Sequence, residues 1–234
     1  MSTELERQND SVIHTSDLWR TYRAGTHQEV HALRGVNLDV SSGSYMALKG
    51  RSGSGKTTLL NCIGGLDRPS KGSVEVFGIE LKELSDKELT RFYRKNVGFI
   101  FQAFGLSPIY TAMENVEIVM QISGKARKQR RERAEYCLDR VGLTKWRNHR
   151  IYELSGGQQQ RIAIARALAN EPRLILADEP TGKLDTSTAR EIFMLFRQIV
   201  EAEKVTVLMA AHDPLVDEYV DQILQLQDGQ IMGR

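Results

Sequence analysis

The chain has 234 residues, of which 41% are hydrophobic and 26% are charged, and its 32 basic and 30 acidic side chains give a formal net charge of +2. This length suits one large α/β domain with a substantial core, and the balance of charge argues neither for nor against a nucleic-acid partner. The longest apolar runs are far shorter than the roughly 20 residues of a membrane helix, so we expect any contact with a membrane to be peripheral.

The N-terminal stretch and the two cysteines both favour a reducing cytosol. The opening stretch, MSTELERQND, has no basic segment followed by an apolar one, so we expect no secretory signal. Cys62 and Cys137 are far apart, with no histidine at metal-ligand spacing. This pattern favours two core thiols over a metal site or a disulfide.

The first hundred residues predict strands interrupted by two helices. VIHTSDLWRTY, HALRGVNLDV and SYMALKG have strand patterns, and KTTLLNCIGGL follows as a helix that ends at its paired glycines. SVEVFG is a short strand. Ser85 and Glu88 fit a capping box that opens the helix DKELTRFYRKN, and the apolar strand VGFIFQ stops at Gln102.

From Ala103 the pattern becomes helical. Thr111 and Glu114 fit the cap of a helix AMENVEIVMQI, and a second helix is expected from about Lys125 to Val141. Strands return in RLILADE, VTVLMAAH and QILQLQDG, with a helix through TAREIFMLFRQIVEAE between them. Apolar strands that alternate with helices predict a mostly parallel sheet covered on both faces. We expect one domain over 1–234, in which 1–102 and 171–234 form an α/β core and 103–170 a helical insert.

GRSGSGKT, residues 50 to 57, matches the pattern G-x-x-x-x-G-K-[ST] and stands between a strand and a helix, as that motif requires. Glycines let successive N–H groups turn toward phosphate, and the helix N-terminus favours the anion. Lys56 is placed for the terminal phosphates and Thr57 for Mg²⁺. A plain glycine-rich helix cap is the weaker alternative. The predicted nucleotide contacts here are Gly50, Arg51, Ser52, Gly53, Ser54, Gly55, Lys56, Thr57 and Thr58.

LILADEP, residues 174 to 180, ends an apolar strand in two carboxylates. Ligands of α/β proteins bind at the carboxyl edge of the parallel sheet, which is where Asp178 and Glu179 would lie. Asp178 is the candidate for holding Mg²⁺, and Glu179 is the candidate for polarising the water that attacks the γ-phosphate. Alone, such a pair is equally consistent with a helix cap; beside the phosphate loop it becomes informative.

LSGGQQQR, residues 154 to 161, opens a buried helix with residues that favour helices weakly. With Ser155 as N-cap, Gly156 and Gly157 occupy the first turn and leave N–H groups open to an anion. One nucleotide is already assigned to residues 50 to 57. The second anion site therefore has a use if it closes over a nucleotide held by another copy of the chain.

These motifs together resemble those of ABC-type ATPases. LSGGQQQR is similar to that family's signature motif, and GRSGSGKT, LILADE, Gln102 after VGFIF, TGKLD and His212 in AAHDP match its other motifs in order. The resemblance covers about Val12 to Gly229. It looks most like the subfamily of macrolide-export, lipoprotein-release and bacitracin-resistance ATPases, and it implies a P-loop NTPase core with an N-terminal antiparallel β subdomain and an inserted helical subdomain.

The resemblance also implies roles for single residues. Tyr22 would stack on adenine, although a plain strand aromatic is an alternative reading. Gln102 would touch Mg²⁺ and Glu179 would be the catalytic carboxylate, with His212 on the γ-phosphate unless it is an ordinary strand-end residue. The contacts that the resemblance places across the dimer of two copies come from Ser155, Gly156, Gly157, Gln158 and Asp185.

The implied activity is ATP hydrolysis, with ATP and Mg²⁺ as cofactors, in a head-to-tail homodimer that drives a separate membrane permease from the cytoplasmic face. The loop FGLSPIY, with Phe104, Leu106, Ile109 and Tyr110, is the expected docking site for a permease helix. Export, lipoprotein extraction and mechanotransmission all remain open. Two rivals are a soluble ABC ATPase of ribosomes or DNA repair, which usually carries tandem cassettes or a coiled-coil insert, and a P-loop kinase, which gives LSGGQ no role.

Two stretches depart from this pattern or lie outside it. Lys183 in TGKLD stands where the subfamily usually has asparagine, which puts the coupling of hydrolysis or the strength of the dimer in doubt; Ala211 replaces a common threonine, a minor change. KARKQRRER, residues 125 to 133, is most simply a solvated helix face. A membrane or partner contact and, less readily, nucleic acid are its alternatives.

Overall fold

A computed structural model describes residues 11–24 and 28–232 of the chain. The expectation about a secretory signal in the first ten residues lies outside this range. Within the described residues, no helix is both long and apolar enough to cross a membrane.

The N-terminal strands form an antiparallel sheet. β1 (Ser11–Ala24) and β2 (Gln28–Ser41) pair along most of their length, and β4 (Lys71–Val76) and β5 (Ile79–Glu80) extend the sheet in the order β2-β1-β4-β5. Alternate apolar side chains such as Ile13 and Leu33 are fully buried on its inner face. This sheet is the antiparallel part that the family resemblance implies.

The second sheet is the parallel core. Its order is β10-β9-β3-β8-β7-β6, and β9, β3, β8, β7 and β6 run parallel to one another while β10 is antiparallel to β9. Continuous apolar sequences form the central strands because both faces are covered. The strands are β3 (Tyr45–Lys49), β6 (Val97–Ile100), β7 (Leu174–Asp178), β8 (Thr206–Ala211), β9 (Gln222–Gln227) and β10 (Gln230–Ile231).

Six α-helices are described, and their predicted caps are confirmed. Ser85, Thr111 and Ser155 each form a capping box with the residue three positions later. The helices are α2 (Lys56–Ile63), α3 (Asp86–Asn96), α4 (Ala112–Ile122), α5 (Arg127–Arg140), α6 (Gly156–Leu168) and α7 (Thr186–Glu203). Short 3₁₀ turns lie at Leu81–Glu83, Thr144–Trp146, Ile151–Glu153 and Pro214–Glu218.

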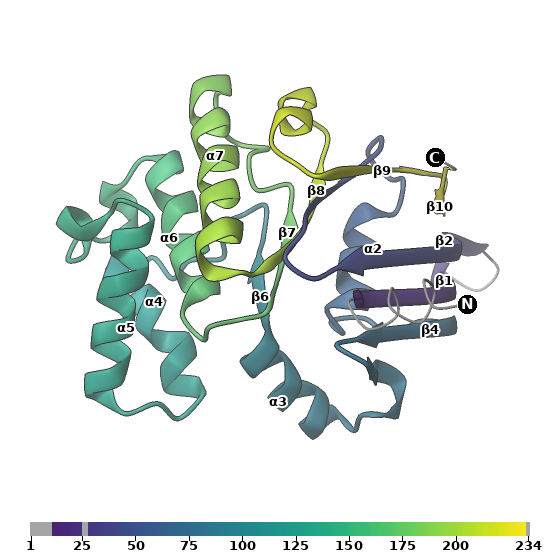
Figure 1. Ribbon diagram of the computed structural model, residues 1–234, viewed down its shortest axis with the longest axis horizontal. Coiled ribbons are helices and arrows are strands. Elements are labelled where there is room, and N and C mark those ends of the chain that lie inside the picture. The colour runs from purple at the N-terminus through teal and green to yellow at the C-terminus, as the bar shows by residue number, and fades with distance from the viewer. Residues whose placement is uncertain (1–10, 25–27, 233–234) are drawn as a thin grey trace.

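The parallel sheet separates two hydrophobic cores. Helices α4 to α7 lie on one side of the parallel sheet, and α2 and the N-terminal sheet lie on the other (Figure 1). On β3, Tyr45 and Ala47 belong to the core that α4 to α7 complete, whereas Met46 and Leu48 belong to the core built with α2, α3 and the N-terminal sheet. The sheet is thus covered on both faces, as predicted. Cys62 and Cys137 are buried, one in each core, and burial raises the pKa of their thiols to about 12 and about 11. They are core thiols.

Helices α4, α5 and α6 pack together at one end of the molecule (Figure 1). Between β6 and β7, the described chain has no strand, and its one ladder contact is an isolated bridge between Thr111 and Arg150. This arrangement agrees with a helical insert, whose boundaries at 103 and 170 remain a prediction.

Candidate functional site

The phosphate loop lies between β3 and α2, at the carboxyl edge of the parallel sheet. Gly55 has φ 105° and caps α2, and a Cβ there would lie 2.5 Å from the carbonyl oxygen of Ala32. A Cβ on Gly50 would collide with the Leu226 carbonyl oxygen. Both positions therefore require glycine. Arg51, Ser52 and Gly53 are exposed at the rim.

Lys56 lies inside this loop, with only 5% of its surface exposed. Its Nζ donates to the carbonyl oxygens of Gly50, at 3.0 Å, and Arg51, at 3.2 Å, and lies 3.4 Å from Oε1 of Glu179. Ser54 Oγ is buried and has no hydrogen-bond partner among the described residues. A buried ammonium and an unpaired hydroxyl inside a turn of N–H groups suit a phosphate chain.

Two carboxylates, Asp178 at the end of β7 and Glu179 after it, lie on the acidic side of the site. Asp178 Oδ1 accepts a hydrogen bond of 3.1 Å from Thr57 Oγ1, which joins the two residues predicted to hold Mg²⁺. Burial raises the pKa of Asp178, with a smaller effect from the neighbouring Glu179. A half-buried carboxylate beside a hydroxyl is a set of hard oxygen donors that fits Mg²⁺, because a divalent cation would offset the desolvation of the carboxylate.

Glu179 is the point at which three strand ends meet. Its Oε2 accepts a hydrogen bond of 3.1 Å from Gln102 Nε2, beyond β6, and lies 3.7 Å from Nδ1 of His212, beyond β8. Its backbone has φ 44°, which is a strained conformation for a residue other than glycine, and its N–H donates to the Ala210 carbonyl oxygen. The structure therefore gathers Lys56, Gln102 and His212 around Glu179.

Tyr22 lies at the exposed end of β1 and is held by a polar network. The guanidinium carbon of Arg20 is 4.4 Å from the centroid of the Tyr22 ring, and the tyrosine hydroxyl donates to Asp67, which also pairs with Arg20. Burial and the hydrogen bond to Asp67 raise the pKa of Tyr22, against smaller opposing effects of Arg20 and of Thr58 in α2. With 37% of its surface exposed, the ring is fixed but open to an aromatic base.

The signature segment is held apart from this cluster. Ser155 Oγ accepts from Gln158 N, and Gln158 Oε1 accepts from Ser155 N, which fixes the start of α6. A Cβ on Gly157 would lie 2.6 Å from Cγ2 of Thr188, so glycine is needed for packing there. A Cβ on Gly156 would meet only Leu184 Cδ2, at 3.5 Å. Packing within the chain thus explains why a glycine stands at position 157, but it does not explain the glycine at position 156.

Asp185 belongs to the same surface as the signature segment. Its carboxylate caps α7 by accepting from the N–H of Thr188, at 3.0 Å, and from its hydroxyl, at 2.6 Å, and these hydrogen bonds lower the pKa of Asp185. In the described part of the chain, no hydrogen bond or ion pair joins residues 155–158 to residues 50–57. The two predicted halves of the site do not meet within one copy. Lys183 is exposed on the turn before Asp185 and forms no ion pair with a described residue.

The predicted docking loop is shaped by two residues that the sequence reasoning missed. Arg166 of α6 donates to the carbonyl oxygens of Gly105, at 2.5 Å, and Phe104, at 2.9 Å. Asn115 of α4 is 1% exposed and bonds the backbone of Ser107 in both directions. An arginine and an asparagine that fall on the apolar faces of their helices are the signal that could have identified them.

The four predicted docking side chains are not equivalent. Ile109 is 67% exposed, while Leu106 packs partly against the core of α4 to α7. Phe104 and Tyr110 are half-buried. Ile109 is therefore the apolar group most available to a partner, and Leu106 also anchors the loop.

Comparison with known proteins identifies relatives along nearly the whole chain. Residues 33–182 match the family model described as ABC transporter. An uncharacterized ABC transporter ATP-binding protein of Thermotoga maritima is 47% identical over 222 residues, covering 95% of this chain and 94% of that protein. The lipoprotein-releasing system ATP-binding protein LolD 1 of Rhodopseudomonas palustris is 44% identical over 95% of this chain and 99% of its own length.

A solved structure gives the same architecture. The dimeric structure of a post-hydrolysis state of the ATP-binding cassette MJ0796 bound to ADP and Pi superposes with a TM-score of 0.86 and 41% sequence identity, over 94% of this chain and 97% of that chain. MJ0796 is a protein of Methanocaldococcus jannaschii. The predicted fold class is therefore confirmed.

Proposed function

The chain belongs to the ABC transporter family and is an ATP-binding cassette of such a transporter, and on that premise we propose that it hydrolyses ATP in a dimer of two copies. Each nucleotide would lie between residues 50–57 of one copy and residues 155–158 of the other. One observation supports this most: Gly156 opens a helix whose first turn has an exposed face, and that face does not meet the phosphate loop of its own chain.

Binding would begin at the phosphate loop. Lys56 donates to the carbonyl oxygens of Gly50 and Arg51 and is balanced by Glu179. Phosphate oxygens are better partners for an ammonium than neutral carbonyls, so nucleotide would displace those hydrogen bonds. Tyr22, braced by Arg20, would stack on the adenine. Thr57, Asp178 and Gln102 would hold Mg²⁺, which would supply positive charge against the phosphates.

Once nucleotide engages Lys56, Glu179 would lose its cationic partner and become the group that accepts a proton from the attacking water. Gln102, which donates to Glu179 at 3.1 Å, would orient that carboxylate, and His212 would contact the γ-phosphate. The first-turn N–H groups of Gly156 and Gly157, from the second copy, would complete the set of donors around the developing charge. The dimer would thus be stable with ATP and weaken after hydrolysis.

The energy of this cycle would drive a separate membrane permease, with the cassette held at the cytoplasmic face of the membrane by the loop Phe104 to Tyr110. That loop follows Gln102 directly, so a residue predicted to sense nucleotide is continuous with the predicted docking surface. Export, lipoprotein extraction and mechanotransmission are the three forms of work that this arrangement can serve. The nature of the permease decides among them.

The test is affinity capture from native membranes. Tagged Glu179→Gln protein, added with Mg-ATP to detergent-solubilised membranes, should retain a membrane permease that mass spectrometry identifies. Wild-type protein with Mg-ADP is the control and should retain less of it. Recovery of ribosomes, DNA or no partner would contradict the transport role and leave the nucleotide chemistry standing.

A further inference from the structure

A basic cavity lies far from the nucleotide site. It has a volume of about 610 Å³ and lies between α3 and the turn that joins α4 to α5. Lys95 and Asn170, which line it, stand shortly before β6 and β7, at the edge of the sheet opposite Gln102 and Asp178. We call it the α3 cavity. Its volume falls within the range of about 300–1,000 Å³ that is usual for small-ligand sites.

One wall of the α3 cavity is a basic face of α3. Lys87, Arg91, Arg94 and Lys95 are spaced for one side of a helix, while Leu89 and Phe92 are buried on the other. None of these four cations lies within ion-pair distance of a carboxylate among the described residues.

The acidic neighbours on α3 are already engaged elsewhere. Asp86 pairs with Arg68, and Glu88 accepts a hydrogen bond of 3.0 Å from the backbone N–H of Ser85 in the capping box. No acidic residue of the described chain lines the cavity. This wall therefore keeps most of its positive charge, although Glu88 has an electrostatic interaction with Arg91.

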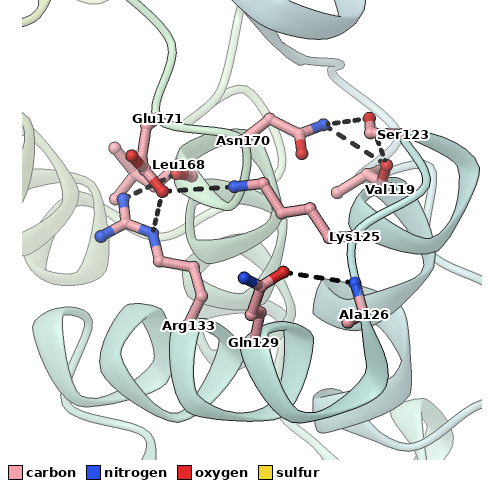
Figure 2. A network of polar contacts seen from close by, with 9 residues as sticks. All are labelled: Val119, Ser123, Lys125, Ala126, Gln129, Arg133, Leu168, Asn170 and Glu171. Atoms are coloured by element: carbon pink, nitrogen blue, oxygen red, sulfur yellow. Dashed lines mark hydrogen bonds and ion pairs between the residues drawn. The ribbon is translucent and has the colours of Figure 1, made fainter.

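The facing wall is held in place by its own polar contacts (Figure 2). Ser123 Oγ donates to the Val119 carbonyl oxygen, at 2.9 Å, and Asn170 Nδ2 donates to Ser123 Oγ, at 3.1 Å. Lys125 Nζ lies 3.2 Å from Glu171 Oε1. These contacts join the end of α4 to the end of α6, so the cavity is formed before any ligand arrives and binding requires little ordering.

A merely solvated helix face does not account for this arrangement. The helix dipole favours cations in the last turn of α3 and so explains Arg94 and Lys95. Lys87 lies in the first turn, where a cation is disfavoured. Lys125, from a different segment, lines the same cavity, but its charge is already paired with Glu171. The four cations of α3 that line the cavity raise the free energy of the folded protein unless an anion joins them.

We propose that the α3 cavity binds a phosphate-bearing anion with at least two negative charges. The phosphate belongs to either a lipid headgroup or a soluble phosphorylated compound. A tetrahedral phosphate offers several oxygens to donors that approach from different directions. Arg91 and Arg94 carry planar forks that match two of those oxygens, and Lys87 and Lys95 add point charges. This site is separate from the ATP site and from the predicted permease loop.

Two triple variants with equal loss of charge test the proposal. The cavity variant is Arg91→Gln, Arg94→Gln and Lys95→Gln. The control is Arg127→Gln, Lys128→Gln and Arg131→Gln on α5, whose side chains are also exposed but do not line the cavity. Cosedimentation with vesicles of phosphatidylcholine, with and without phosphatidic acid, whose phosphomonoester can carry two negative charges, tests the lipid source. Calorimetric titration with pyrophosphate, at saturating Mg-ADP so that residues 50–57 are occupied, tests the soluble source.

We expect the cavity variant to lose about a hundredfold in affinity for one of the two probes, because each basic side chain near an anionic surface contributes about fivefold. The control should stay within about threefold of the wild type. Loss confined to vesicles assigns a lipid headgroup, and loss confined to pyrophosphate assigns a soluble ligand. Equal losses in both variants, no loss in either, or no binding by the wild type would overturn the proposal. Unchanged ATP affinity shows that each variant is folded.

Discussion

Replacing Gly156 by alanine separates the two reasons for which a glycine can stand in the first turn of α6. The added Cβ would lie 3.5 Å from Cδ2 of Leu184, an ordinary van der Waals contact. Alanine also favours helix by roughly 0.5–1 kcal/mol over glycine in helix interiors, and by less at the end of a helix. We therefore expect the melting temperature of Gly156→Ala to be unchanged or about 1–2 °C higher, given the size of the chain.

The rate of ATP hydrolysis by Gly156→Ala, in contrast to its stability, should fall. If the open face of Gly156 receives the nucleotide of a second copy, the methyl group blocks that approach and removes a donor contact. Loss of one such donor costs about 10²–10³ in turnover. ATP binding by the separate monomer should stay within about threefold of the wild type, because residues 50–57 are untouched.

Gly157→Ala is the matched comparison. Its Cβ would lie 2.6 Å from Cγ2 of Thr188, whose hydroxyl and N–H are both bound to Asp185 and so limit its movement. Overpacking of this kind costs about 1–3 kcal/mol, or roughly 3–9 °C in melting temperature. Thermal unfolding and steady-state phosphate release, run on both variants, separate the two effects. A Gly156→Ala protein that hydrolyses ATP at the wild-type rate would refute the reasoning.

Three further outcomes follow from the site. Glu179→Gln should reduce turnover by about 10²–10⁴ through loss of the general base while ATP binding persists, and gel filtration with ATP should show a dimer; a monomer under those conditions would contradict the shared site. Burial raises the pKa of Asp178, so its charged form costs stability in the nucleotide-free protein. In thermal unfolding at neutral pH, Asp178→Asn should then be more stable than the wild type, and the difference should shrink as the pH falls and the wild-type carboxyl takes up its proton. The affinity of the variant for Mg²⁺ should fall. A variant less stable than the wild type at neutral pH would show that burial does not disfavour the charged carboxylate. Lys183→Asn should leave ATP affinity within about threefold, and lost binding in a fluorescent-nucleotide titration would show that Lys183 is misplaced.

Elements that a local pattern determines could be predicted well from the sequence. Ser85, Thr111 and Ser155 are predicted correctly because a capping box is a contact over three residues. The phosphate loop is likewise a local motif. Long-range partners are different, because nothing near Tyr22 in the chain indicates that Asp67 holds its hydroxyl.

The same limit applies to the contacts within the site. The place of Glu179 after an apolar strand indicates its proposed role, but its contacts with Lys56, Gln102 and His212 depend on the order of β3, β6, β7 and β8 in the sheet. The α3 cavity is invisible in the sequence for a related reason. KARKQRRER is conspicuous as a run of charge, whereas Lys125 alone of that run lines the cavity, opposite basic residues of another helix.

The hydrogen bonds from Arg166 to the carbonyl oxygens of Phe104 and Gly105 couple the position of the loop to that of α6. Arg166 stands ten residues after Gly156, about 15 Å along a continuous helix. Because a continuous helix of this length is stiff, a movement at the Arg166 end of α6 also moves its Gly156 end. A displacement of the loop beside Gln102 would therefore move Gly156 as well. A push from a membrane partner would then change the distance between the two proposed nucleotide-binding surfaces, with no alteration inside either of them.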